Sequence, residues 1–161
     1  MAITAYKNPR VYAGPPLGAK ETVTAVDSQT WKAGQFGYYS TTGKALPCAR
    51  GQSAVRFQFA EDQDTETSTS TAVITRIQST VTQFVGYVCA GANDTTAQLT
   101  HRGETAGIYV GSNVCIVNVS NDTDAVFNIQ GPLWDKEGYK NASTDGPGQV
   151  IFTVSAAALV A

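Results

Sequence analysis

The most constraining feature of this chain is its excess of β-branched residues over the helix-favouring Leu and Met. Val, Ile and Thr together number 43 of the 161 residues, whereas Leu and Met number only 6. β-Branched side chains lose rotamers in a helix but pack well on the pleated surface of a strand. The chain is therefore expected to be all-β, folded as a small sandwich or barrel.

The length and the charge balance narrow the possible classes of protein. A chain of this size can bury a sizeable core without a disulfide or a metal, and one domain is expected. It carries 11 basic and 13 acidic side chains, with a net charge of -2. A chain with this charge balance is not expected to have the dense basic face of nucleic-acid-binding proteins, so no direct contact with DNA or RNA is expected. No apolar run has the length of a signal peptide or a membrane span, which predicts cytoplasmic synthesis and no membrane partner.

The first part of the chain, residues 1–21, is predicted to be an extended arm, because prolines at positions 9, 15 and 16 prevent a helix or a central strand. The arm is more apolar than a solvated linker needs to be, so it is expected to be covered by its own domain or by a partner. Its candidate interface residues combine two cations with aromatic, aliphatic and proline side chains. They are Tyr6, Lys7, Pro9, Arg10, Val11 and Tyr12.

Residues 22–161 are predicted to form a single β-domain, because short apolar runs alternate there with Gly, Asn, Asp and Pro. Alternation places Arg56 and Gln58 towards water and predicts a set of core residues. The predicted core residues are Val55, Phe57, Phe59, Phe152 and Val154 from alternation, together with Val114 and Ile116 from an apolar run. The run 114–117 alternates poorly, which predicts a strand covered on both faces. Residues 60–71 and 135–148 are predicted to be mobile loops, and 71–82 fits either a short helix or a strand.

The chain shows no pattern typical of catalysis, a cofactor or a metal site. Its one histidine, His101, is expected to be a solvated turn residue, and no serine lies in a nucleophile motif. The acidic segment 61–66 lacks the glycine and the terminal glutamate of a calcium loop. Cys48, Cys89 and Cys115 are odd in number and far apart, which predicts buried, reduced and inert thiols. The chain is therefore not expected to be an enzyme.

Glycine-bracketed strand segments carry a resemblance to a known group of proteins. The sequence FVGYV at 84–88 is followed by the segment 102–119, and segments 31–39 and 42–47 repeat the pattern of a strand that reaches a glycine turn and returns. In this the chain resembles the small head decoration, or cement, proteins of tailed bacteriophages. The acidic segment 60–71 is longer than a minimal domain of that kind needs.

The resemblance implies a β-tulip or jelly-roll-like domain that associates as a trimer or dimer. It also implies a place on the capsid surface of the virion, where the protein would bind the major capsid protein and stabilise the head after synthesis in the host cytoplasm. The alternative is a phage tail, fibre or host-binding module, including a carbohydrate-binding sandwich. Sugar binding would use aromatic side chains, for which the candidates are Trp31, Tyr38, Tyr39, Trp134 and Tyr139.

Overall fold

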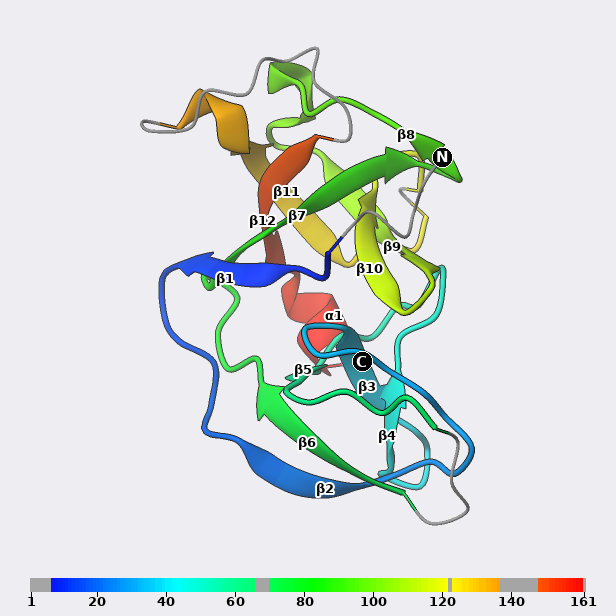
Figure 1. Cartoon of the computed structure of the whole chain (residues 1–161). Helices are drawn as coiled ribbons and strands as arrows, with labels where there is room; N and C mark the ends of the chain where they lie inside the picture. The colour runs from blue at the N-terminus through cyan, green and yellow to red at the C-terminus, as the bar shows by residue number, and fades with distance from the viewer. Residues whose placement is uncertain (1–6, 66–69, 122, 137–147, 161) are drawn as a thin grey trace.

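The computed structural model describes residues 7–65, 70–121, 123–136 and 148–160 (Figure 1). Strands dominate these ranges, which confirms the all-β expectation. The strands are β1 (Arg10–Ala13), β2 (Glu21–Ala25), β3 (Phe36–Tyr39), β4 (Ala45–Pro47), β5 (Phe57–Phe59), β6 (Ser70–Arg76), β7 (Gln83–Ala90), β8 (Asn93–Asp94), β9 (Thr105–Gly111), β10 (Val114–Asn118), β11 (Phe127–Pro132) and β12 (Gln149–Val154). The helical elements are the 3-10 turns η2 (Leu99–His101) and η3 (Leu133–Asp135) and the helix α1 (Ala156–Val160).

Strands β2 to β6 form a closed barrel in the order β2-β4-β3-β5-β6, here called the N-terminal barrel. The pairing of β2 with β4 is parallel, and the other pairings in this barrel are antiparallel. The barrel closes because β2 also pairs with β6, from Glu21 opposite Ile74 to Ala25 opposite Ser70. It forms the lower part of the molecule in Figure 1.

The later strands form a second closed arrangement, here called the C-terminal ring. Its order is β7-β10-β9-β11-β12, and β12 returns to pair with β7. The β7–β10 pairing is parallel and the others are antiparallel. Strands β1 and β8 add to β7 outside this ring, so the proline-containing arm supplies an edge strand of the sheet.

The two closed sheets share apolar contacts at their junction. The ring of Phe36, from β3 of the N-terminal barrel, lies 5.3 Å from that of Phe84 and 5.5 Å from that of Phe127, both in the C-terminal ring. Helix α1 also reaches the junction, where the Val55 N–H donates to the Ala158 carbonyl over 3.0 Å. The N-terminal barrel keeps a smaller aromatic core of its own.

The structure tests several of the sequence-based predictions directly. All seven predicted core residues are buried, and every residue of β10 is buried, as expected for a strand covered on both faces. Gln58 was expected to face water, and this prediction is wrong. Its side chain is 6% exposed, because its amide donates to the carbonyls of Pro9 and Gly34 at 2.8 Å each. Within 71–82 the chain is a strand as far as Arg76.

The two predicted loops are described only in part. Residues 66–69 and 137–147 lie outside the described residues. Within the first segment, Gln63 forms an isolated antiparallel bridge with Trp31, and β6 begins at Ser70. The described part of the acidic segment is therefore tied to the N-terminal barrel.

Candidate interaction surface

The arm of residues 7–18 crosses the junction between the two closed sheets, and Asn8 fixes its start. The Asn8 amide donates to the Ala33 carbonyl over 3.2 Å and to the Asn113 carbonyl over 3.1 Å. Its side-chain oxygen accepts from the Cys115 N–H at 2.8 Å. Asn8 thus joins the N-terminal barrel to two points in the C-terminal ring. The sequence analysis missed this role, and an asparagine before a proline gives no signal for it.

Two of the candidate interface residues face the protein's own core. Pro9 is buried over Gly86 of β7, where an added Cβ would lie 3.1 Å from the Pro9 Cγ. Tyr12 is half-buried and packs on an outer cluster of Val85, Leu133 and Ile151. These contacts anchor β1 on the C-terminal ring.

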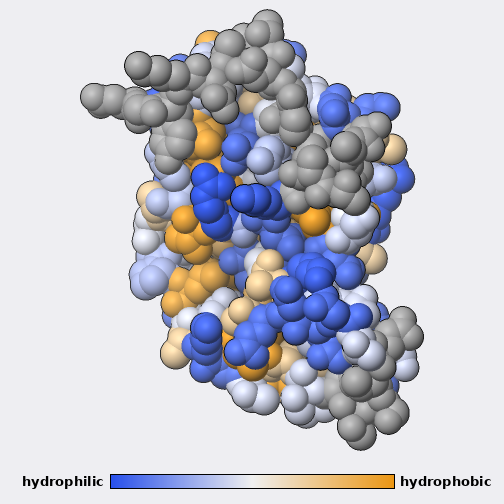
Figure 2. Space-filling view, viewed as in Figure 1, coloured by the Kyte–Doolittle hydropathy of each residue, from blue (hydrophilic) through white to orange (hydrophobic). Residues whose placement is uncertain are grey.

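The other described candidates face outward. Lys7, Arg10 and Val11 are exposed, and Val11 is 39% exposed on β1. Tyr6 lies outside the described residues. Figure 2 shows strongly hydrophilic and hydrophobic residues side by side at the level of β1. The arm therefore has an anchored inner side and an outer side that carries two cations and an aliphatic group.

His101 does not lie where the sequence analysis placed it. It ends the 3-10 turn η2 and is 9% exposed, so the expectation of a solvated side chain is wrong. Its Nδ1 accepts a hydrogen bond of 3.2 Å from the Gln98 N–H, which folds the imidazole back against its own turn. Among the described residues, no group of three His, Cys, Asp or Glu side chains could hold a metal ion.

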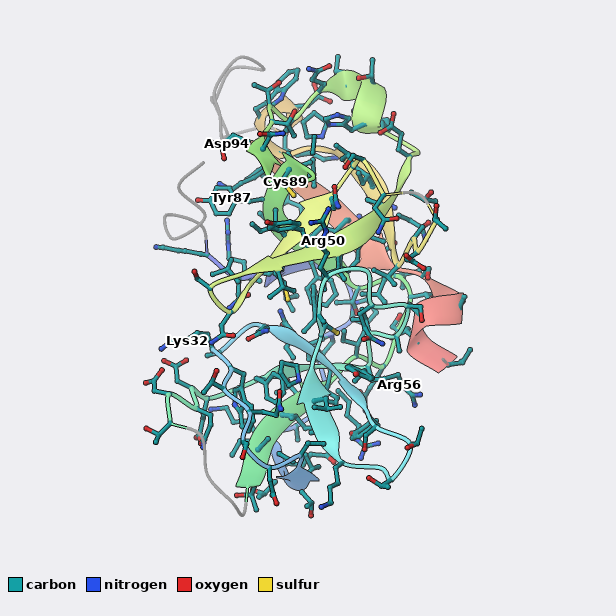
Figure 3. All side chains as sticks on the ribbon, turned by 90° about the vertical axis from the view of Figure 1, so that its right-hand side faces the viewer. Lys32, Arg50, Arg56, Tyr87, Cys89 and Asp94 are labelled. Carbon is teal, nitrogen blue, oxygen red and sulfur yellow. The ribbon has the colours of Figure 1, made fainter. Side chains whose placement is uncertain are left out.

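The three cysteines are free and buried, as predicted. Burial raises the pKa of Cys89 and of Cys115 to about 12. It also raises the pKa of Cys48 well above its ordinary value, and the Cys48 thiol donates to the Ala54 carbonyl at 3.3 Å. Figure 3 shows Cys89 on the C-terminal ring, near Arg50 of the segment between β4 and β5. A thiol with a raised pKa carries little reactive thiolate at neutral pH, so the predicted inertness has a physical basis.

The acidic segment binds a cation of its own chain. The Lys32 ammonium pairs with Asp64 and lies 3.7 Å from an Asp62 oxygen, and hydrogen bonding to Asp64 raises the Lys32 pKa. The other Asp62 oxygen accepts from the Ala33 N–H at 2.7 Å. These carboxylates hold the segment on the N-terminal barrel.

The candidate aromatic residues for sugar binding do not form one platform. Trp31 is 2% exposed and stacks on Phe59 with ring centroids 4.6 Å apart, so it belongs to the core. Trp134 is half-buried in the 3-10 turn η3 that follows β11, and its indole N–H donates to the Ala97 carbonyl. Tyr139 lies outside the described residues.

Tyr38 and Tyr39 are half-buried on β3. The guanidinium groups of Arg56 and Arg76 lie 6.0 and 5.6 Å from the centre of the Tyr39 ring. The Tyr39 hydroxyl is buried without a hydrogen-bond partner among the described residues, and burial raises its pKa. Figure 3 shows Arg56 on the N-terminal barrel, away from Tyr87 on the C-terminal ring.

Comparisons with protein-family models, with curated proteins and with solved structures found no match to this chain. In the part of the chain that the structure describes, no helix is long and apolar enough to cross a bilayer.

Proposed function

We propose that this chain is a structural virion protein that binds the outside of an assembled tailed-phage head and stabilises its shell. The observation that supports this most is the arm, which is anchored through Asn8, Pro9 and Tyr12 and carries Lys7, Arg10 and Val11 on its outer side. A segment that is already ordered loses little conformational entropy when it binds. Such an arm suits docking by surface complementarity.

The proposed partner is the major capsid protein, and the proposed self-association is a trimer or a dimer. Strand β1 lies at the edge of its sheet and pairs with β7 among the described strands. An edge strand presents backbone N–H and C=O groups that a strand of another chain can pair with. The arm thus offers both backbone and side-chain contacts to a neighbour.

The test is co-sedimentation of the purified protein with empty heads assembled from the major capsid protein of the same genome. The informative variant is Val11→Asp, which places a charge on the exposed edge strand. The matched control is Leu99→Asp, at a position that is 51% exposed in η2 and distant in sequence from the arm. Both changes are at the surface and should alter the free energy of unfolding by only about 0.5 kcal/mol.

We expect the wild-type protein and Leu99→Asp to sediment with the heads, and Val11→Asp to bind about tenfold more weakly, because docking would bury the new carboxylate. Heads that sediment without the wild-type protein would contradict the proposed function. Equal binding of the two variants would contradict the role of the arm. Point variants are preferable to deletion of residues 2–16, since deletion also removes the anchoring contacts of Asn8 and Pro9.

A further inference from the structure

A cavity of about 340 Å³ opens beside the start of β1. Its lining comes from the arm, from β7 and from the first residue of β12. The lining residues are Lys7, Asn8, Arg10, Val85, Gly86, Tyr87 and Gln149. The chemistry of these walls indicates which class of ligand the cavity can hold.

The charge of the cavity is opposite to that of the whole chain. Among the described residues that line it, Lys7 and Arg10 are basic and none is acidic, whereas the chain carries a net charge of -2. The ion pairs found among the described residues join other cations, namely Lys32, Arg76 and Arg102, to carboxylates. Two cations in one cavity that no described carboxylate pairs with favour an anionic ligand.

The two charged groups that line the cavity are hydrogen-bond donors. Asn8 already uses its amide and its carbonyl oxygen on the backbone. The Gln149 side-chain oxygen accepts from Arg10 at 3.4 Å. Lys7 supplies an ammonium and Arg10 its remaining guanidinium N–H groups. A ligand here must therefore accept hydrogen bonds.

The floor of the cavity is apolar and closely packed. Val85 is fully buried, and Gly86 leaves room for the Pro9 ring to cover β7. An anion that enters the cavity would place its oxygens between Lys7 and Arg10. Since the proposed partner is a protein, the anion that it can present here is an Asp or Glu carboxylate.

We propose that this cavity binds the carboxylate of an Asp or Glu side chain presented by the partner protein. The inference rests on the proposed function, because it assigns the arm's cations a specific contact on the shell. Arg10 is suited to the contact because its planar guanidinium can pair with both oxygens of a carboxylate.

The first test needs no shell. The ¹⁵N-labelled protein is titrated with the peptide acetyl-Gly-Asp-Gly-amide, with its Asn counterpart and with inorganic phosphate. We expect saturable shifts of the Gly86, Tyr87 and Gln149 amides with the Asp peptide alone, with a Kd of about 1 mM. The variant Lys7→Gln/Arg10→Gln should lose these shifts. Lys20→Gln/Lys44→Gln removes two exposed lysines outside the cavity and should keep them.

The second test uses the heads. Lys7→Glu/Arg10→Glu and Lys20→Glu/Lys44→Glu change the net charge equally, and only the first pair should weaken binding, by about tenfold. Absence of peptide shifts, or equal shifts with phosphate or the Asn peptide, would overturn the inference even if the wild-type protein binds heads. Asp-specific shifts without any binding to heads would support the ligand chemistry of the cavity and overturn the proposed function.

Discussion

The N-terminal barrel and the C-terminal ring are both closed five-strand arrangements, but they differ in how they fill their interiors. The barrel encloses a small cluster in which Trp31, Phe57 and Phe59 are the large side chains. The ring has a larger core, to which the N-terminal half adds four residues. These are Phe36, Cys48, Val55 and Ile77. The junction is therefore packed as a core, and the stability of the ring depends on residues of the barrel.

The arm adds a second connection between the two regions. The Asn8 side chain donates to Ala33 of the barrel and accepts from Cys115 of the ring. The Pro9 carbonyl accepts from Gln58 of the barrel, and β1 pairs with β7 of the ring. This comparison predicts that changes in the shared core, in the arm and in the buried thiols lower the free energy of unfolding by different amounts.

The largest effect is expected for Phe36→Ala. Phe36 is fully buried and its ring contacts three phenylalanine rings of the C-terminal ring. The lost contacts and the cavity should lower the free energy of unfolding by about 4 kcal/mol. Urea denaturation followed by fluorescence measures this loss.

The control for the shared core is Phe57→Ala, which removes an equally buried ring from the barrel's own cluster. We expect a loss of about 3 kcal/mol. Hydrogen exchange should quicken in both regions for Phe36→Ala and chiefly in β2 to β6 for Phe57→Ala. A loss below about 1 kcal/mol for Phe36→Ala would show that the junction is not a core.

A smaller effect is expected for Asn8→Ala. The variant leaves three backbone groups at the junction without their side-chain partner. Two of these hydrogen bonds are part-buried and the one to Ala33 is exposed, so we expect the free energy of unfolding to fall by about 1 kcal/mol. Asn128→Ala is the control, since it truncates a half-buried asparagine within β11. Equal losses for the two variants in thermal unfolding would refute the anchoring role of Asn8.

The smallest effect on the free energy of unfolding near neutral pH is expected from ionisation of the buried thiols. This effect should grow as the pH becomes alkaline. The folded-state pKa of Cys115 is about 12, against an ordinary value of 9.0. As the pH rises, the Cys115 thiol therefore loses its proton in the unfolded chain before it does so in the folded protein. The contribution of the protonated thiol to the free energy of unfolding is complete below pH 9 and is lost between pH 9 and 12. Cys115→Ala should make the melting temperature fall less steeply over this range. A parallel decline for both proteins would contradict the assignment.

The sequence predicts which strand residues are buried in this molecule, but it does not predict which strands pair with one another. Alternation identified Phe57, Phe152 and the rest of the predicted core outside β10, because burial on a strand repeats every two residues. It misplaced Gln58, whose partners are the distant carbonyls of Pro9 and Gly34. The small all-β barrel or sandwich was predicted, but the division into two closed sheets and their strand orders were not, since strand pairing depends on contacts between residues far apart in the chain.

The extended arm of the candidate surface was predicted from the sequence, but the side chains that it turns inward and the cavity beside it were not. The prolines indicated an extended arm, and Val11 and its neighbours do form a strand. Which side chains of that strand face inward depends on its register with β7, including the shift between Val11 and Ala13. The cavity could not be predicted, because Gln149 joins Lys7 and Arg10 from the other end of the sequence.

Amide hydrogen exchange of residues 7–14, in the free protein and in the protein mixed with heads, tests most directly whether the arm is anchored on β7 and docks on a shell. We predict slow exchange already in the free protein for amides that pair with β7, because the arm is anchored before it binds. We also predict that heads slow the remaining amides of β1 and leave those of η2 unchanged. Fast exchange throughout the free arm would show that the arm is not anchored, and no further protection on binding would show that it does not dock.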